Sequence, residues 1–181
     1  PYVKLYLEIL IENKYHNKAK KFLKKVWMEN SHPEFKSQIF SLAKASGINL
    51  TEFVKFIINK NSQNENSIIL LVESLIEDKK WNLARSEIKK LLDVNPKKEI
   101  CLLMAKIENG DTGDIQKVNS WSLRARNGSE NNIWVCMFTK KSQNIWTSVS
   151  QGGYFNSLEW RQPYMLNDNF KLTERFIDHE N

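Results

Sequence analysis

The sequence predicts an all-α protein, a solenoid of helical hairpins that ends in a short, aromatic-rich and partly β tail. Apolar residues recur at helical spacing along most of the chain, in stripes separated by short polar breaks. Only six glycines and four prolines occur in 181 residues, which disfavours a turn-rich β-sandwich. Beyond Gly128 the stripes give way to short runs of tryptophan and β-branched residues, which indicate strands.

The stretch from Ile68 to Pro96 shows the hairpin pattern most clearly. Two apolar stripes flank the polar break at residues 77–80, so two helices joined by a short turn are expected. In the second helix a small residue is followed by bulky residues and then by Pro96, an order typical of the tetratricopeptide (TPR) repeat. Any helical hairpin with the same periodicity would also fit this stretch. The residues expected to pack between helices are Trp81, Ala84, Ile88 and Leu91.

The first hairpin repeats these offsets 65 residues earlier, which is close to two TPR repeats of about 34 residues. Its first helix carries apolar residues between positions 3 and 10, and a polar turn follows at residues 12–14. In its second helix we expect Ala19, Leu23 and Val26 to pack against the neighbouring helices.

A second hairpin is therefore expected between these two. Apolar residues at positions 35–43 predict its first helix, which Gly47 should end. Thr51 should act as the N-cap of its second helix, and the Asn-rich residues 59–66 should form a loop.

The fourth hairpin and the tail complete the chain. Helices are predicted at residues 100–107 and 115–126, with a longer turn at 109–114 between them. The repeat domain is thus assigned to residues 1–128, a tail with strands at 133–136 and 145–147 to residues 129–163, and a polar extension to residues 164–181.

Positive charge is concentrated in the first third of the chain. Residues 1–60 contain 11 Lys and 5 Glu, which accounts for the whole net charge of +6. Four lysines, Lys14, Lys18, Lys21 and Lys25, are spaced to share one face of the second helix and could lie against an anionic surface. A solvated helix face is the simpler interpretation. The face has neither arginine nor interleaved aromatic residues, so we expect no nucleic-acid partner.

No pattern in the sequence indicates catalysis. His16, His32 and His179 lack partners at metal-ligand spacing and are expected at the surface. Cys101 falls on an apolar stripe and Cys136 has no motif that would make it a nucleophile. The glycines form no phosphate-binding loop. We therefore expect a non-enzymatic protein with no cofactor.

Five segments carry a more specific signal: residues 26–35, 81–85, 103–108, 134–136 and 155–161. In this order and spacing they resemble the HemY family of bacterial membrane-anchored TPR proteins, which is associated with haem biosynthesis. The resemblance covers residues 1 to about 163. It implies an N-terminal membrane anchor, outside this sequence, and a helical-repeat domain on the cytoplasmic side of the inner membrane. The chain begins with Pro1, so we expect it to be part of a longer protein.

In related members the tail resembles a zinc ribbon with two Cys-x-x-Cys knuckles. This sequence keeps Cys136, has Thr139 at the partner position, and reduces the second knuckle to residues 149–152. One thiol cannot replace four, so no metal is expected. Instead, Trp134, Trp146 and Trp160 should pack to hold the tail together.

Two functions follow from the resemblance and the repeats. The first is a scaffold for protein–protein interaction, with a concave groove for protein partners such as enzymes of haem synthesis. The alternative is a porphyrin- or haem-binding carrier, although the sequence has no Cys-Pro haem motif.

Overall fold

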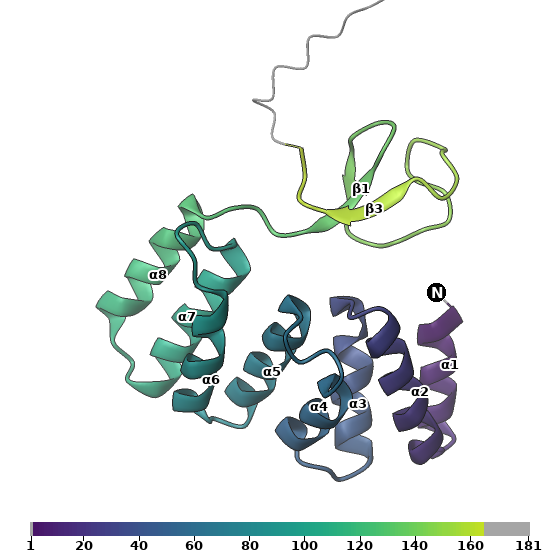
Figure 1. Ribbon diagram of the computed structural model, residues 1–181, viewed down its shortest axis with the longest axis horizontal. Helices are drawn as coiled ribbons and strands as arrows, with labels where there is room; N and C mark the ends of the chain where they lie inside the picture. The colour runs from purple at the N-terminus through teal and green to yellow at the C-terminus, as the bar shows by residue number, and fades with distance from the viewer. Residues whose placement is uncertain (1, 165–181) are drawn as a thin grey trace, which may run out of the picture. The chain divides into compact units, whose positions relative to one another are not determined.

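The computed structural model describes residues 2–164, which form eight α-helices and then a three-stranded sheet. The prediction of a mostly helical chain with a small β tail is confirmed. The chain divides between Ser129 and Glu130 into two compact units, one helical and one containing the sheet (Figure 1).

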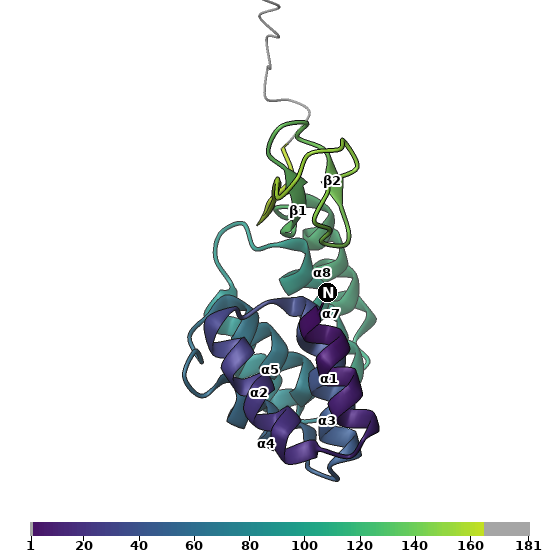
Figure 2. The same cartoon turned by 90° about the vertical axis from the view of Figure 1, so that its right-hand side faces the viewer.

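The helical unit consists of four consecutive hairpins. Its α-helices are α1 (Tyr2–Glu12), α2 (His16–Glu29), α3 (Lys36–Ala45), α4 (Leu50–Ile58), α5 (Glu65–Glu77), α6 (Trp81–Ile88), α7 (Lys98–Asp111) and α8 (Ile115–Asn127). Two short 3₁₀ turns, η1 (Pro33–Phe35) and η2 (Lys89–Leu91), precede α3 and follow α6. In Figure 2, α1 and α3 lie on one side of the first two hairpins, and α2 and α4 lie on the other.

A left-handed residue recurs in the turn of every hairpin. Lys14, Gly47, Lys79 and Gly113 have φ between 56° and 65°, at intervals of 33, 32 and 34 residues. In the first three turns the same two hydrogen bonds end the preceding helix, which is the Schellman arrangement. After Lys79, for example, the Lys80 N–H donates to the Leu75 carbonyl at 2.8 Å. The structure is therefore periodic at the level of its backbone turns.

One continuous apolar cluster runs from α1 to α7. Trp27 is 1% exposed in its centre, and its indole N–H donates to the Ser67 hydroxyl at 2.9 Å, which connects α2 with α5. Between α6 and α7, the guanidinium of Arg85 donates to Glu108 at 3.1 Å and to Asp111 at 2.8 Å. Polar contacts between hairpins thus accompany the apolar packing.

Three predicted helix boundaries are wrong. The loop expected at residues 59–66 is shorter, because the Asn64 side chain caps α5, which begins at Glu65. The N-cap of α4 is Asn49, whose side chain accepts from the Glu52 N–H, and Thr51 lies inside the helix. The Thr51 hydroxyl instead donates to Asp78, in the turn of the next hairpin, at 2.5 Å. Likewise α7 continues to Asp111 through Gly110, where a turn was expected. A Cβ at Gly110 would lie 2.3 Å from the Trp81 ring, so glycine permits the close approach of Trp81 rather than a turn.

The second unit is a small antiparallel sheet in the order β2-β1-β3. Its strands are β1 (Ile133–Cys136), β2 (Ser142–Gln143) and β3 (Leu158–Arg161). Trp134 pairs with Trp160 across β1 and β3, and their rings lie 5.3 Å apart, edge to face. The strand predicted at residues 145–147 is absent from the described structure, because Gln143 and Thr147 hold this segment in a loop by side-chain hydrogen bonds.

Candidate functional site

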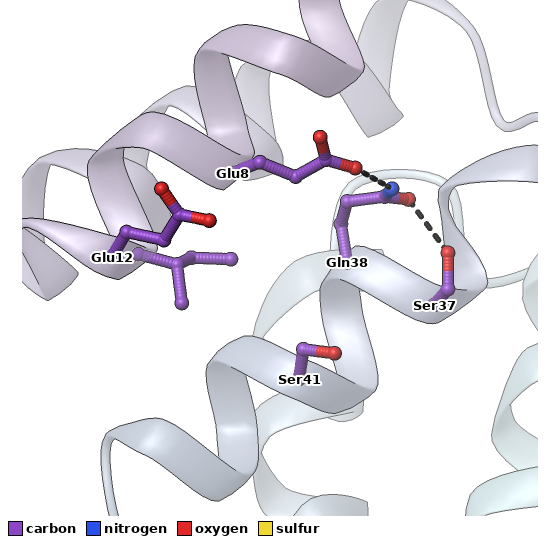
Figure 3. Close-up of a pocket in the computed structure, with 6 residues that line it drawn as sticks. Glu8, Glu12, Ser37, Gln38 and Ser41 are labelled. Carbon is purple, nitrogen blue, oxygen red and sulfur yellow. Dashed lines mark hydrogen bonds between the residues drawn. The ribbon is translucent and has the colours of Figure 1, made fainter.

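A hollow of about 250 Å³, lined mostly by polar residues, lies between α1 and α3 (Figure 3). Glu8 and Glu12 of α1 face Ser37, Gln38 and Ser41 of α3 across it. The Gln38 amide donates to the Glu8 carboxylate at 3.3 Å, and its own oxygen accepts from the Ser37 hydroxyl at 3.0 Å. The hollow therefore presents carboxylates and hydroxyls on otherwise regular helices, a surface that can hold polar or cationic side chains.

A second, smaller hollow of about 90 Å³ lies on the other flank of α3. It is lined by residues from α2, η1, α3, α5 and α7, namely Trp27, Pro33, Lys36, Asn66, Ile69, Leu70, Glu73 and Glu99. Lys36 forms an ion pair with Glu73 in this hollow. Burial raises the pKa of Glu99, and the nearby charges of Glu73 and Glu65 raise it further.

The two hollows are neighbours along one surface, which we call the odd-helix surface because α1, α3, α5 and α7 supply most of it. Lys36 lines one hollow and the adjacent Ser37 lines the other. None of these residues carries a motif, so the sequence did not identify them. They belong to segments that are far apart along the chain, from α1 to α7, and these segments meet only because the hairpins stack.

The residues predicted to pack between helices are placed as follows. Ala19, Leu23, Ala84 and Ile88 are each 0% exposed. Val26, Trp81 and Leu91 are half-buried, and Trp27 occupies the buried position next to Val26. The α6 helix ends at Ile88, so Leu91 belongs to the 3₁₀ turn that follows it.

Three of the four predicted face lysines lie on α2, and all four are exposed. Lys18, Lys21 and Lys25 are within the helix. Lys14 precedes it, in the left-handed turn, so the expectation that all four lie on the helix is wrong. The predicted spacing extended the helix back to Lys14, but the Schellman turn places this residue before the helix begins.

One of the histidines expected at the surface is buried. His32 is 5% exposed and its Nδ1 accepts from the Glu34 N–H at 3.2 Å, which caps the 3₁₀ turn before α3. Burial lowers the pKa of His32, with a smaller opposing contribution from the Glu34 charge. His16 is half-buried at the start of α2, and His179 lies outside the described residues.

The two cysteines are buried in different settings. Burial raises the pKa of the Cys101 thiol in α7. At Cys136 burial acts in the same direction, but hydrogen bonds from the Ser150, Ser157 and Thr139 hydroxyls outweigh it and lower the pKa to about 6. The Cys136 sulfur lies 3.4 Å from the Ser157 hydroxyl.

The turn after β1 and the turn at residues 150–153 each contain a left-handed residue. Lys140 follows Thr139 with φ 59°, and Gly153 ends the second turn with φ 83°. Among residues 2–164, however, no three His, Cys, Asp or Glu side chains come together as a metal would require. The thiol of Cys136 is surrounded by hydroxyl groups.

Comparison with protein-family models gives no match, and neither do comparisons with curated proteins and with solved structures. Within the described part of the chain, no helix has the length and apolar character needed to cross a membrane.

Proposed function

We propose that this chain is a non-enzymatic scaffold for protein–protein interaction, a TPR-like solenoid whose odd-helix surface receives a protein partner. The observation that carries the proposal is the pair of hollows on either side of α3. In stacked hairpins such a surface is continuous and accessible, which is how helical-repeat proteins bind extended segments. The left-handed turns at intervals of 32 to 34 residues support the repeat architecture.

The size and chemistry of the hollows favour the scaffold over a porphyrin or haem carrier. Their volumes of about 250 and 90 Å³ are below the roughly 300–1,000 Å³ of usual small-molecule sites. The larger is lined by two carboxylates, two hydroxyls and an amide, with Ile11 as its apolar residue. A flat apolar macrocycle needs a larger slot, without carboxylates along its walls. By the resemblance to the HemY family, the partners would be enzymes of haem synthesis at the inner membrane.

The test compares proteins captured by the wild-type chain with those captured by a variant whose larger hollow is blocked. Ser37→Arg with Ser41→Arg fills this hollow from two exposed positions of α3, so the fold should be retained. Ser86→Arg with Asn82→Arg, at exposed positions of α6, is the matched control. Partners retained by the wild type and the control but lost by the blocked variant would support the scaffold.

Equal capture by all three proteins would contradict the assigned surface. A saturable shift of the Soret band, when haem is added to the purified chain, would favour the carrier and contradict the scaffold as the primary role.

A further inference from the structure

The even-numbered helices are strongly basic, whereas the odd-numbered helices are slightly acidic. Within the helix bounds, α2, α4, α6 and α8 contain ten basic and three acidic residues. The helices α1, α3, α5 and α7 contain five basic and eight acidic residues. Half of the basic residues of the even set belong to α2 alone, against one glutamate, Glu29.

Three lysines on the outer side of α2 are free to meet an external anion; we call Lys18, Lys21 and Lys25 the lysine face. All three are exposed. Lys25 lies 3.9 Å from Glu29, with both side chains more than half exposed, and such a surface pair contributes little. Within residues 2–164, neither Lys18 nor Lys21 forms an ion pair with an acidic side chain. The other two lysines of α2, Lys20 and Lys24, lie over the ring of Phe56 instead.

An apolar stripe on α1 adjoins the lysine face. It consists of Tyr2, Leu5, Tyr6 and Ile9, spaced three, one and three residues apart on one side of the helix and between 37% and 85% exposed. Lys18 lies 5.9 Å from the Tyr6 ring, and this ring contacts Phe22 of α2 edge to face at 4.9 Å. The stripe and the lysines thus form one surface of the first hairpin. Glu8, by contrast, points into the hollow beside α3.

We infer that this surface of the α1–α2 hairpin binds an anionic lipid surface. Lysines attract the lipid headgroups while their aliphatic stems lie along the interface, and exposed Leu, Ile and Tyr side chains insert at the headgroup boundary. Leu5 and Ile9 are aliphatic and cannot stack on bases, although the two tyrosines of the stripe could. Residues 1–60 contain no arginine, the side chain that most often contacts bases. Protein interfaces are enriched in arginine and depleted in lysine, which disfavours an acidic protein as the occupant. The inference does not depend on the scaffold role, which uses the odd-helix surface.

The experiment measures sedimentation of the 181-residue chain with vesicles of phosphatidylcholine, with and without phosphatidylserine, at low and at physiological salt. One variant replaces the lysine face by glutamine (Lys18→Gln, Lys21→Gln, Lys25→Gln), and another replaces the stripe (Leu5→Gln, Ile9→Gln). The matched control removes the same charge at three exposed lysines elsewhere: Lys44→Gln, Lys60→Gln, Lys89→Gln. Circular dichroism checks that each variant is folded.

We expect the wild type to bind anionic vesicles and not neutral ones, more weakly as salt rises. The lysine variant should lose roughly 100-fold in partition coefficient at low salt, and the control variant much less. The stripe variant should bind more weakly at both salt concentrations, because apolar insertion is not screened. No binding at low salt, equal losses in the lysine and control variants, or no loss in the stripe variant would overturn the inference. Tighter binding to duplex DNA or to polyglutamate at the same salt would also overturn it.

Discussion

Two lysines adopt a left-handed backbone conformation in hairpin turns where glycine occupies the other two. This conformation costs an L-residue with a side chain roughly 1 kcal/mol, and glycine very little. We therefore expect Lys79→Gly to raise the free energy of unfolding by about 0.5 to 1 kcal/mol. Gly47→Ala should lower it by about 1 kcal/mol, purely through the backbone, because a Cβ at Gly47 would meet no atom within 4 Å. Urea unfolding measures both.

The control for this pair is Lys44→Gly, at an exposed position inside α3, where glycine should be destabilising. If Lys79→Gly destabilised the protein as much as Lys44→Gly does, the left-handed turn would not be the source of strain.

Gly110 packs directly against the ring of Trp81. Gly110→Ala would place a methyl group only 2.3 Å from a carbon of this ring, so the ring or α7 must move, at a cost of about 1 to 3 kcal/mol. In a Trp81→Leu background the same substitution should cost much less, because the smaller side chain leaves space. A double-mutant cycle by thermal or urea unfolding measures this coupling. Additive costs would show that the ring is not the obstacle.

At the residue scale, the sequence identified the buried small and bulky positions but not the polar exceptions. Ala19 and Ala84 were predicted because each occupies the small position of the TPR pattern, and both are buried. The buried His32 was not, because its cap to the Glu34 N–H follows from the 3₁₀ turn that Pro33 begins. Gly110 was assigned to a turn because glycine is common in turns. Its actual role in a helix depends on the ring of Trp81, which lies 29 positions earlier in the chain.

At the scale of elements, Asp78 connects the second and third hairpins. Its carboxylate accepts from the Thr51 hydroxyl and N–H, the Asn49 amide and the Lys80 ammonium. Burial favours the neutral acid, but these hydrogen bonds outweigh burial and lower the pKa of Asp78 below its ordinary value. Asp78→Asn should therefore cost about 2 kcal/mol at neutral pH, since it removes charge-assisted hydrogen bonds.

The pH dependence of this cost follows from the direction of the shift. A carboxyl with a lowered folded-state pKa stabilises the fold above its unfolded pKa of about 3.9. That contribution is lost as the pH falls from there through the folded pKa. The difference between wild type and Asp78→Asn in urea unfolding should thus shrink below about pH 4. A pH-independent difference between wild type and Asp78→Asn would contradict the assignment.

The crossing of α6 with its neighbours is tested at Ala84. This residue is 0% exposed, so Ala84→Leu should overpack the crossing and cost about 1 to 3 kcal/mol. The melting temperature reports the loss. Ser86→Leu, at an exposed position of the same helix, adds similar bulk and should leave the melting temperature nearly unchanged. Equal melting temperatures for wild type and Ala84→Leu would contradict the proposed repeat register.

The order of helices could be predicted from the sequence, whereas some of their ends could not. Apolar periodicity extends over whole helices and survives local exceptions, so all eight helices have counterparts in the predicted hairpins. Helix ends depend on single hydrogen bonds. Asn49 and Thr51 are both good cap residues, and only the position of Asp78 decides that Thr51 bonds across to the next hairpin. In the tail, β2 is two residues long and carries too little pattern to be recognised.

At the scale of the whole molecule, the surfaces were the least predictable feature. The excess of lysine in residues 1–60 was evident from the sequence, as was the spacing of Lys18, Lys21 and Lys25. The odd-helix hollows were not, because each is assembled from different helices. The exposed stripe of α1 was not either, because it depends on which apolar residues of α1 the neighbouring helices leave uncovered. A sequence gives the face of each helix that is apolar, but neighbours decide which part of that face becomes covered.

We expect the second unit to bind no structural metal. A structural zinc site needs four thiolate or imidazole ligands, and here Cys136 is accompanied by hydroxyl groups, which are poor zinc ligands at neutral pH. The sheet is instead held by β1 pairing with both neighbours and by the contact between Trp134 and Trp160. We therefore expect elemental analysis to find no stoichiometric zinc, and a chelator to leave the melting temperature unchanged. Trp160→Ala should destabilise this unit in the same assay, by about 1 to 3 kcal/mol. One zinc per chain, or a melting temperature that falls when a chelator is added, would show that a metal and not the tryptophan pair stabilises the tail.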